Sequence, residues 1–148
     1  MTTGQWVLLV CVLSVVGFAM YRVATDGKFR GTRQTRLGAA KPSGETPATV
    51  LNAAGVAVPL GERATLLQFS SAFCAPCRAT RRVLGEVAEL VPGVTHVEVD
   101  AEHHLEVVRS LRVLRTPTTL ILDPEGREVS RASGLPQRDQ VLAALDRA

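Results

Sequence analysis

A pair of cysteines lies where an apolar segment passes into an amphipathic helix, and this junction constrains the fold most. Residues 64–71 form a compact apolar run, which predicts a buried strand of a parallel sheet. Residues 75–91 carry apolar side chains on one helical face and are followed by a Pro-Gly pair, which predicts a helix with a defined end. Cys74 and Cys77 therefore stand between a strand and the N-terminus of a helix.

The rest of the domain continues the alternation of strand and helix. A turn at Pro124-Glu125-Gly126 predicts that the last two strands are antiparallel, and residues 48–60 predict a short hairpin at the domain edge. The order β-α-β-α-β-β-α predicts an α/β fold with a central mixed sheet and helices on both faces. Its later elements are expected at 94–100 (strand), 103–113 (helix), 118–123 and 127–133 (strands) and 137–147 (helix).

The position of the two cysteines predicts thiol–disulfide chemistry. Cys74 at a helix N-terminus is near unsatisfied backbone N–H groups, which favour its thiolate and make it the nucleophile. Cys77 lies one turn into the helix, where it can resolve a mixed disulfide formed on Cys74. Arg78 follows directly and is expected to modulate the dithiol. The third cysteine, Cys11, lies in a separate apolar run, so one candidate pair remains.

A structural zinc site is the other common use of two cysteines at this spacing. His103 and His104 are the histidines that could complete it. They are adjacent at a helix start and would point about 100° apart, whereas zinc ligands usually come as two closely spaced pairs on loops. We therefore expect no metal site.

An uncharged apolar run from Trp6 to Tyr21 predicts a membrane helix, with residues 1–22 forming a single-pass signal-anchor. A cleaved signal peptide is the main alternative. It would need a basic region before the apolar stretch, and the first 21 residues contain no Lys or Arg. Residues 23–48 are rich in Gly, Thr, Arg, Ala and Pro, which predicts a basic flexible linker, and residues 49–148 form the folded domain.

The charge distribution favours a membrane partner over nucleic acid. Residues 1–41 carry six basic groups against one acid, a net charge of +5, while the remainder carries eleven against thirteen, a net charge of −2. The basic residues that follow the apolar run place the domain on the cytoplasmic face by the positive-inside rule, with the extracytoplasmic face as the alternative. The domain has no basic patch interleaved with aromatic residues, so nucleic-acid binding is not expected.

Three separated motifs resemble the thioredoxin superfamily over residues from about 50 to 148. The segment from Phe73 to Cys77 is similar to the family's WCGPC motif, Arg115-Thr116-Pro117-Thr118 resembles the segment holding its cis-proline, and Gly134 follows the last strand as a glycine does in the family. The resemblance implies a thioredoxin-like fold with a cis Pro117 beside Cys74. It also implies that substrates are contacted by Phe73, Ala75, Pro76, Thr116 and Pro117.

The chain departs from the family pattern beneath the cysteines. Gln68 stands where thioredoxins carry a buried acid, and His96 stands where they carry its lysine partner. An amide does not exchange a proton near neutral pH, so Cys77 would need water or another base for its deprotonation.

These features predict a membrane-tethered protein disulfide reductase that forms a Cys74–Cys77 disulfide in each cycle. The chain has no motif for a nicotinamide or flavin, so reducing equivalents must come from an external reductase or a membrane dithiol carrier. We expect protein disulfide substrates and a monomeric state. The alternative is a thioredoxin-fold binding or chaperone-like module with weak redox activity, which serves a membrane partner.

Overall fold

A mixed sheet forms the centre of the folded domain. The computed structural model describes residues 3–25, 27–31 and 46–148. β2 pairs with β3 in parallel, and the other neighbouring strands are antiparallel, so the mixed sheet is confirmed. The strand order is β1-β5-β4-β2-β3, with β1 at Arg30–Gly31, β2 at Ala64–Ser70, β3 at Val94–Asp100, β4 at Thr118–Leu122 and β5 at Glu128–Ser133.

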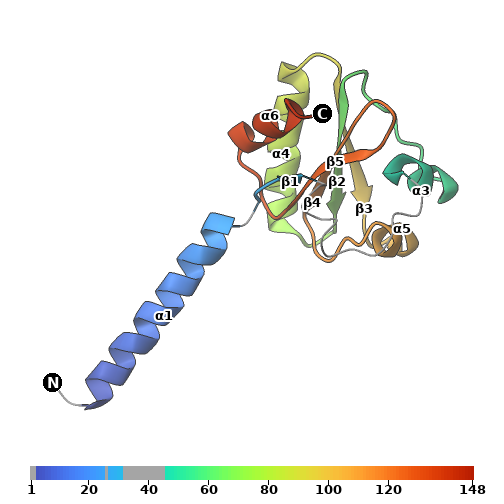
Figure 1. Cartoon of the computed structure of the whole chain (residues 1–148). Helices are drawn as coiled ribbons and strands as arrows, with labels where there is room; N and C mark the ends of the chain where they lie inside the picture. The colour runs from blue at the N-terminus through green and yellow to red at the C-terminus, as the bar shows by residue number, and fades with distance from the viewer. Residues whose placement is uncertain (1–2, 26, 32–45) are drawn as a thin grey trace.

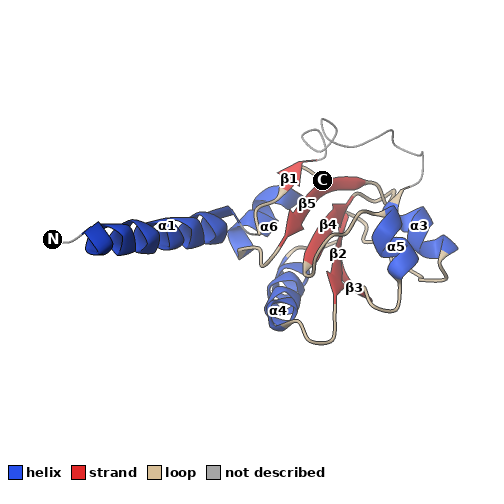
Figure 2. Ribbon diagram, turned by 90° about the horizontal axis from the view of Figure 1, so that it is seen from below, coloured by secondary structure: helices blue, strands red, loops and turns tan. Residues whose placement is uncertain are grey.

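Helices cover both faces of the sheet, as expected (Figures 1 and 2). On one face, α4 (Ala75–Leu90) and α6 (Arg138–Leu145) pack through Leu84, Val87 and Val141 against Leu66 and Ile121. The other face is covered by α3 (Pro47–Ala53) and α5 (Leu105–Ser110). Its buried cluster consists of Leu51, Leu67, Phe69, Val99, Val107, Leu111, Val113, Leu120 and Leu122.

β2 lies at the centre of this arrangement and is buried along its whole length. Because helices cover both of its faces, successive side chains enter different apolar clusters, with Leu66 on the α4 side and Leu67 on the α5 side. This explains why its sequence is a continuous apolar run rather than an alternating one. The strand ends at Ser70, four residues before Cys74.

The predicted hairpin over residues 48–60 is wrong. Residues Pro47–Ala53 form the helix α3 instead, and Thr46 is its N-cap, accepting a hydrogen bond at its Oγ1 from the backbone N–H of Thr49 at 3.2 Å. A Thr before a Pro at the first helical position is a helix-start signal, which here outweighs the alternating apolar pattern. The helix buries Ala48 and Leu51 toward the sheet.

The expected linker over residues 23–48 contains regular structure at its described positions. Helix α1 extends to Thr25, Arg30–Gly31 form β1 against β5, and α3 starts at Pro47. A two-residue strand has no sequence signature because its pairing depends on the register of a distant strand. The part of the predicted linker at 32–45 lies outside the described residues.

The N-terminal helix α1 (Thr3–Thr25) is long and apolar enough to cross a membrane. The window from Gly4 to Arg22 has a mean hydropathy of 1.9, and none of it is buried against the rest of the protein. A signal sequence near an N-terminus has the same length and composition, so the helix is a candidate membrane span.

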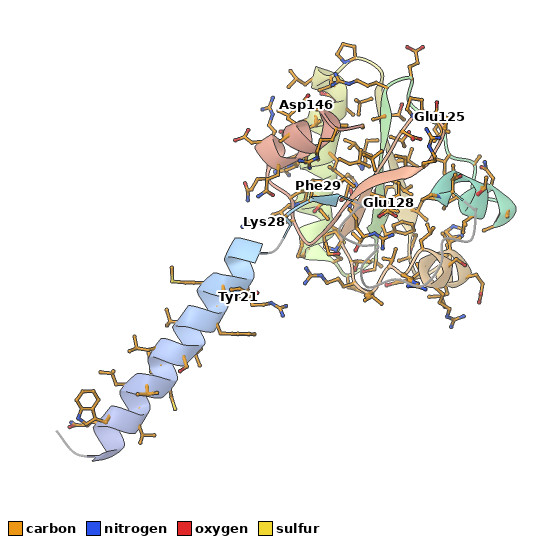
Figure 3. The ribbon with its side chains drawn as sticks, viewed as in Figure 1. Tyr21, Lys28, Phe29, Glu125, Glu128 and Asp146 are labelled. Atoms are coloured by element: carbon orange, nitrogen blue, oxygen red, sulfur yellow. A yellow bond between two sulfur atoms is a disulfide. The ribbon has the colours of Figure 1, made fainter. Side chains whose placement is uncertain are left out.

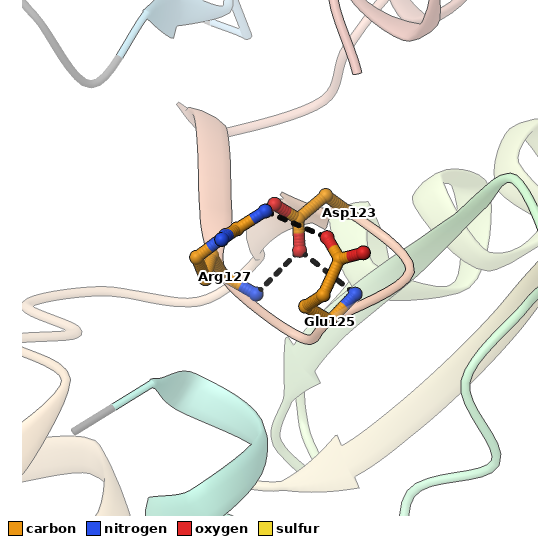
Figure 4. A network of polar contacts seen from close by, with 3 residues as sticks. All are labelled: Asp123, Glu125 and Arg127. Carbon is orange, nitrogen blue, oxygen red and sulfur yellow. Dashed lines mark hydrogen bonds and ion pairs between the residues drawn. The ribbon is translucent and has the colours of Figure 1, made fainter.

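A charged turn joins β4 to β5 at the expected position (Figure 4). Asp123 accepts hydrogen bonds from the backbone N–H groups of Glu125 at 3.0 Å and Arg127 at 2.8 Å, and from the Arg127 Nε at 2.7 Å. Burial alone would raise the pKa of this carboxyl, but the hydrogen bonds and the charge of Arg127 outweigh it and lower the pKa. Asp123 therefore holds the turn in its ionised form.

We expect Asp123→Ala to lower the free energy of unfolding by about 1–3 kcal/mol at pH 7, because two backbone N–H groups lose their acceptor. A carboxyl with a lowered pKa in the folded state stabilises above its unfolded pKa, near 4, and this contribution is lost as the pH falls through the folded value. Urea denaturation at pH 7 and pH 3 should therefore show a smaller difference between the two proteins at pH 3. An equal difference at both pH values would contradict this account.

Candidate active site

Cys74 and Cys77 occupy the junction between β2 and α4, as predicted. Cys74 is the N-cap of α4, and its Sγ accepts a hydrogen bond from the backbone N–H of Cys77 at 3.1 Å. The two are joined by a disulfide with a Cα–Cα distance of 5.2 Å. Cys74 is half-buried, whereas Cys77 is only 3% exposed, so an approaching sulfur would reach Cys74 first.

The N-cap position also stabilises charge on a reduced Cys74. The first N–H groups of a helix have no partner within the helix, and they lie at the positive end of its dipole. A thiolate on Cys74 would accept the hydrogen bond that the Cys77 N–H already donates to the same sulfur. The backbone therefore favours the nucleophilic form of Cys74, the more accessible cysteine of the pair.

The loop that holds Pro117 lies at the same end of the sheet. The Thr116–Pro117 peptide bond is cis, as the family resemblance implies. The hydroxyl groups of Ser71 and Thr116 are hydrogen-bonded at 3.1 Å, which joins this loop to the segment that leads to Cys74. Gly134 donates its N–H to the Pro117 carbonyl at 2.8 Å, so the residue after β5 supports the same loop.

Two large apolar side chains are almost fully exposed in the loops around the dithiol. Phe73 is 99% exposed and Leu114 is 94% exposed. Of the other predicted contact residues, Ala75 and Pro76 are exposed, Thr116 is half-buried and Pro117 is buried. Arg78 is also exposed. Leu114 was not among the predicted site residues, although an apolar residue between Arg112 and Arg115 in a short loop is a usable signal.

Gln68 lies directly beneath the dithiol and is fully buried. Its Nε2 donates a hydrogen bond to the Cys77 carbonyl at 3.0 Å, and its Oε1 is 3.1 Å from His96 Nε2. Because the amide oxygen faces His96, this ring nitrogen must carry the hydrogen and donate it. The absence of the family's acid is thus accompanied by a different pair, the buried Gln68 with the half-buried His96.

His96 lies near two charged side chains, Glu98 of β3 and Arg81 of α4. Burial lowers the pKa of its imidazole, the Glu98 carboxylate raises it and Arg81 lowers it, and the overall shift is downward. Burial alone would raise the pKa of Glu98, but its hydrogen bond and ion pair with Arg81 help to lower it. Arg81 is therefore engaged with β3 rather than directed at the cysteines.

We expect Gln68→Leu to lower the free energy of unfolding by about 1–3 kcal/mol, because the Cys77 carbonyl and the His96 N–H lose a partner. The double variant Gln68→Leu/His96→Leu should be less destabilised than the sum of the two single variants, since no imidazole N–H is then left behind. Urea denaturation of all four proteins measures this coupling. Simple addition of the single effects would mean that the two side chains are not paired.

The two histidines considered as zinc ligands have other structural roles. His103 Nδ1 is 2.9 Å from an Asp100 carboxylate oxygen, and His104 is the N-cap of α5. Within residues 3–25, 27–31 and 46–148, no group of three or more His, Cys, Asp or Glu side chains could hold a metal ion.

Comparison with known proteins agrees with this geometry. The thioredoxin family model matches residues 55–147, which is more than half of the chain. The chain belongs to the thioredoxin family. Thioredoxin of Chlamydia trachomatis is 32% identical over 82 residues, covering 55% of this chain and 79% of that protein. Thioredoxin of Alicyclobacillus acidocaldarius is 33% identical over 86 residues, covering 57% of this chain and 81% of that protein.

Solved structures of thioredoxins share the fold. The Fasciola hepatica thioredoxin is 25% identical with a TM-score of 0.52, covering 59% of this chain and 82% of that one. A thioredoxin-2 of a malaria parasite is 15% identical with a TM-score of 0.54, covering 62% of this chain and 88% of that one. Thioredoxin family membership and the Cys74–Cys77 pair identify the chain as a thiol–disulfide oxidoreductase.

Proposed function

We propose that this chain is a membrane-tethered reductase of protein disulfides. The observation that carries the proposal is the difference between its two cysteines, with Cys74 half-buried at the N-cap of α4 and Cys77 only 3% exposed behind it. A nucleophile that faces the substrate and a resolving thiol that does not are what a dithiol exchange mechanism needs.

The reaction consists of two exchanges. The Cys74 thiolate attacks one sulfur of a substrate disulfide, which forms a mixed disulfide and releases the other substrate sulfur as a thiolate. Cys77, after losing its proton, attacks the Cys74 sulfur, forms the Cys74–Cys77 disulfide and releases the second substrate thiol. Two electrons and two protons pass to the substrate. An external two-electron donor, either a reductase or a membrane dithiol carrier, must then reduce the Cys74–Cys77 disulfide.

The surrounding residues have supporting roles in this proposal. Phe73, Ala75 and Pro76 are exposed beside the dithiol, and Thr116 with Pro117 lies in the neighbouring loop, so these residues contact the substrate chain. Beneath the dithiol, Gln68 holds the Cys77 carbonyl. The exposed Arg78 follows Cys77 in α4 and adds positive charge next to the site.

The candidate span α1 supports the membrane tether. The basic residues that follow it favour a cytoplasmic domain by the positive-inside rule, with the extracytoplasmic face as the alternative. A reporter fused to the C-terminus of the chain tests this orientation. Reporter activity only outside the cytoplasm would overturn the cytoplasmic assignment.

A second candidate function is a redox-weak binding or chaperone-like module for a membrane partner. Gln68 favours it, because a buried amide that is hydrogen-bonded to the Cys77 carbonyl cannot take the proton of the Cys77 thiol. In this case the exposed Phe73 and Leu114 would serve binding alone.

Reduction of insulin by the full chain in detergent, with dithiothreitol as the donor, separates the two functions. We expect turnover by the unaltered protein and a fall to the background rate for Cys74→Ser. The matched control is Cys11→Ser, which removes the free cysteine of α1 and should keep full activity. If the unaltered protein is no faster than Cys74→Ser, the reductase proposal fails and the binding module remains.

A further inference from the structure

The chain enters the folded domain at the end of the sheet that carries the dithiol. β1 is antiparallel to β5, with Arg30 opposite Arg131 and Gly31 opposite Ser130. The residues before β1 therefore run toward the end of β5, and the Gly27 N–H donates a hydrogen bond to the Ser133 carbonyl at 2.9 Å. Ser133 is the last residue of β5.

The strand register places the site at this same end. Ser133 is opposite Thr118, the first residue of β4, and Thr118 is opposite Phe69 near the end of β2. The Pro117 loop and the segment leading to Cys74 extend from these two strands. Figure 1 shows the C-terminal end of α1 at the end of the domain where α4 begins.

The segment between α1 and the domain is held firmly against the sheet. Gly27 is buried with φ of 74°, and a Cβ on it would lie 2.0 Å from the Leu135 carbonyl oxygen, so no other residue fits there. Phe29 packs against the apolar cluster that α4 and α6 form with the sheet (Figure 3). One residue, Asp26, separates Gly27 from the end of α1. Two Cα–Cα steps span at most about 8 Å, so the domain stays close to the end of the candidate span.

The charge at this end of the domain suits a membrane surface. Residues 71–78, 111–118 and 133–138 contain four arginines and no Asp or Glu. The nearby acids are Asp139, which follows Arg138, and Asp100 and Glu102, which lie at and just after the end of β3, the edge of the sheet opposite β1. Anionic lipid headgroups attract basic side chains within about a Debye length. The four arginines are Arg78, Arg112, Arg115 and Arg138, and all four are exposed.

We propose that the dithiol acts on disulfides in the membrane-proximal segments of integral membrane proteins. The inference rests on the proposed function, namely that α1 spans the membrane and that Cys74 and Cys77 reduce protein disulfides. Its chemistry is the same two exchanges, with the substrate disulfide held near the bilayer. The short docked connection turns the active-site end of the domain toward the bilayer. A disulfide close to the bilayer then has a high effective concentration at Cys74, whereas a disulfide far from the bilayer does not.

The test uses the full chain in liposomes that contain a single-span model substrate. One substrate has a disulfide loop two residues from its span, and a second has the same loop twenty residues away on a rigid helical spacer, about 30 Å further out. We expect the proximal disulfide to be reduced about tenfold or more faster than the distal one. A soluble peptide with the same loop measures the intrinsic rate.

Two variants of the connection sharpen the test. A 20-residue Gly/Ser insertion between Asp26 and Gly27 adds a reach of about 25 Å and should reduce the preference to less than about twofold. Gly27→Val should do the same by undocking the segment. The matched control is the same insertion after Gly38, which leaves the path from α1 to β1 unchanged and should keep the preference. Reduction of the soluble peptide at the unaltered rate shows that each variant is folded.

Equal rates on the proximal and distal substrates, with normal reduction of the soluble peptide, would overturn this inference and leave the proposed reductase standing. A preference that survives both variants of the connection would also overturn it. If the soluble peptide is not reduced by the unaltered protein, the proposed function fails, and the inference fails with it.

Discussion

Replacement of Cys77 by serine will leave substrates covalently attached to Cys74. Cys74 is the accessible sulfur at the N-cap of α4, and the nearly buried Cys77 behind it is the thiol that would release the mixed disulfide. Without the resolving thiol, the second exchange has no nucleophile within the protein. In the insulin assay with dithiothreitol as the donor, we expect turnover to fall toward the background rate of Cys74→Ser, because each adduct must then be released by dithiothreitol rather than by Cys77.

The trapped species is measured on non-reducing gels as an adduct that dithiothreitol releases. The experiment should use a Cys11→Ser background, because Cys11 is a free exposed cysteine that could form its own adducts. In that background, Cys74→Ser should trap nothing. An adduct on Cys77 in the Cys74→Ser protein would mean that the roles of the two cysteines are reversed. Recovery of the adduct from cells would also identify the natural partner and its compartment.

Replacement of Phe69 by alanine should cost about 3–5 kcal/mol of the free energy of unfolding. Phe69 is fully buried near the end of β2, where it belongs to the cluster between the sheet and the helices α3 and α5. Its removal leaves a cavity that a sheet covered on both faces cannot close by small shifts. Since small domains are stable by only about 5–15 kcal/mol, this loss is a large share of the total.

Phe73→Ala is the matched control for this stability measurement. The same side chain is removed four residues later, but Phe73 is 99% exposed, so the free energy of unfolding should change by no more than about 0.5 kcal/mol. Thermal and urea denaturation followed by circular dichroism on the oxidised proteins measures both variants. Similar losses for the two would contradict the assignment of Phe69 to the core.

The strands, helices and cysteine pair of the site were predictable because their signals are local. The alternating run at 94–100 has the bounds of β3, and the apolar run before Cys74 forms β2. In contrast, β1 consists of two residues whose pairing depends on Ser130 and Arg131, a hundred residues away, and no local pattern reports it. The helix α3 was predicted as a hairpin because its apolar residues alternate, although Thr46 and Pro47 form a helix-start signal.

In the site too, the positions of residues were predictable from the sequence, whereas their contacts were not. Gln68 could be recognised as a departure from the family, since its position follows from its separation from Cys74 along the sequence. The hydrogen bonds of Gln68 to the Cys77 carbonyl and to His96 could not be predicted, because they depend on the packing of α4 over β2 and on the register of β2 with β3. The exposure of Leu114 likewise depends on how its loop is held beside β5.

The pairing of β1 with β5 bears on where a soluble form of this protein should begin. β5 would be an edge strand without β1, and an uncovered edge invites pairing with another chain. A truncated protein that starts at Thr46 removes β1, the buried Gly27 and the packed Phe29. One that starts just before Gly27 keeps all three while omitting the apolar helix. The choice between these two starting points should decide whether the purified domain stays monomeric in solution.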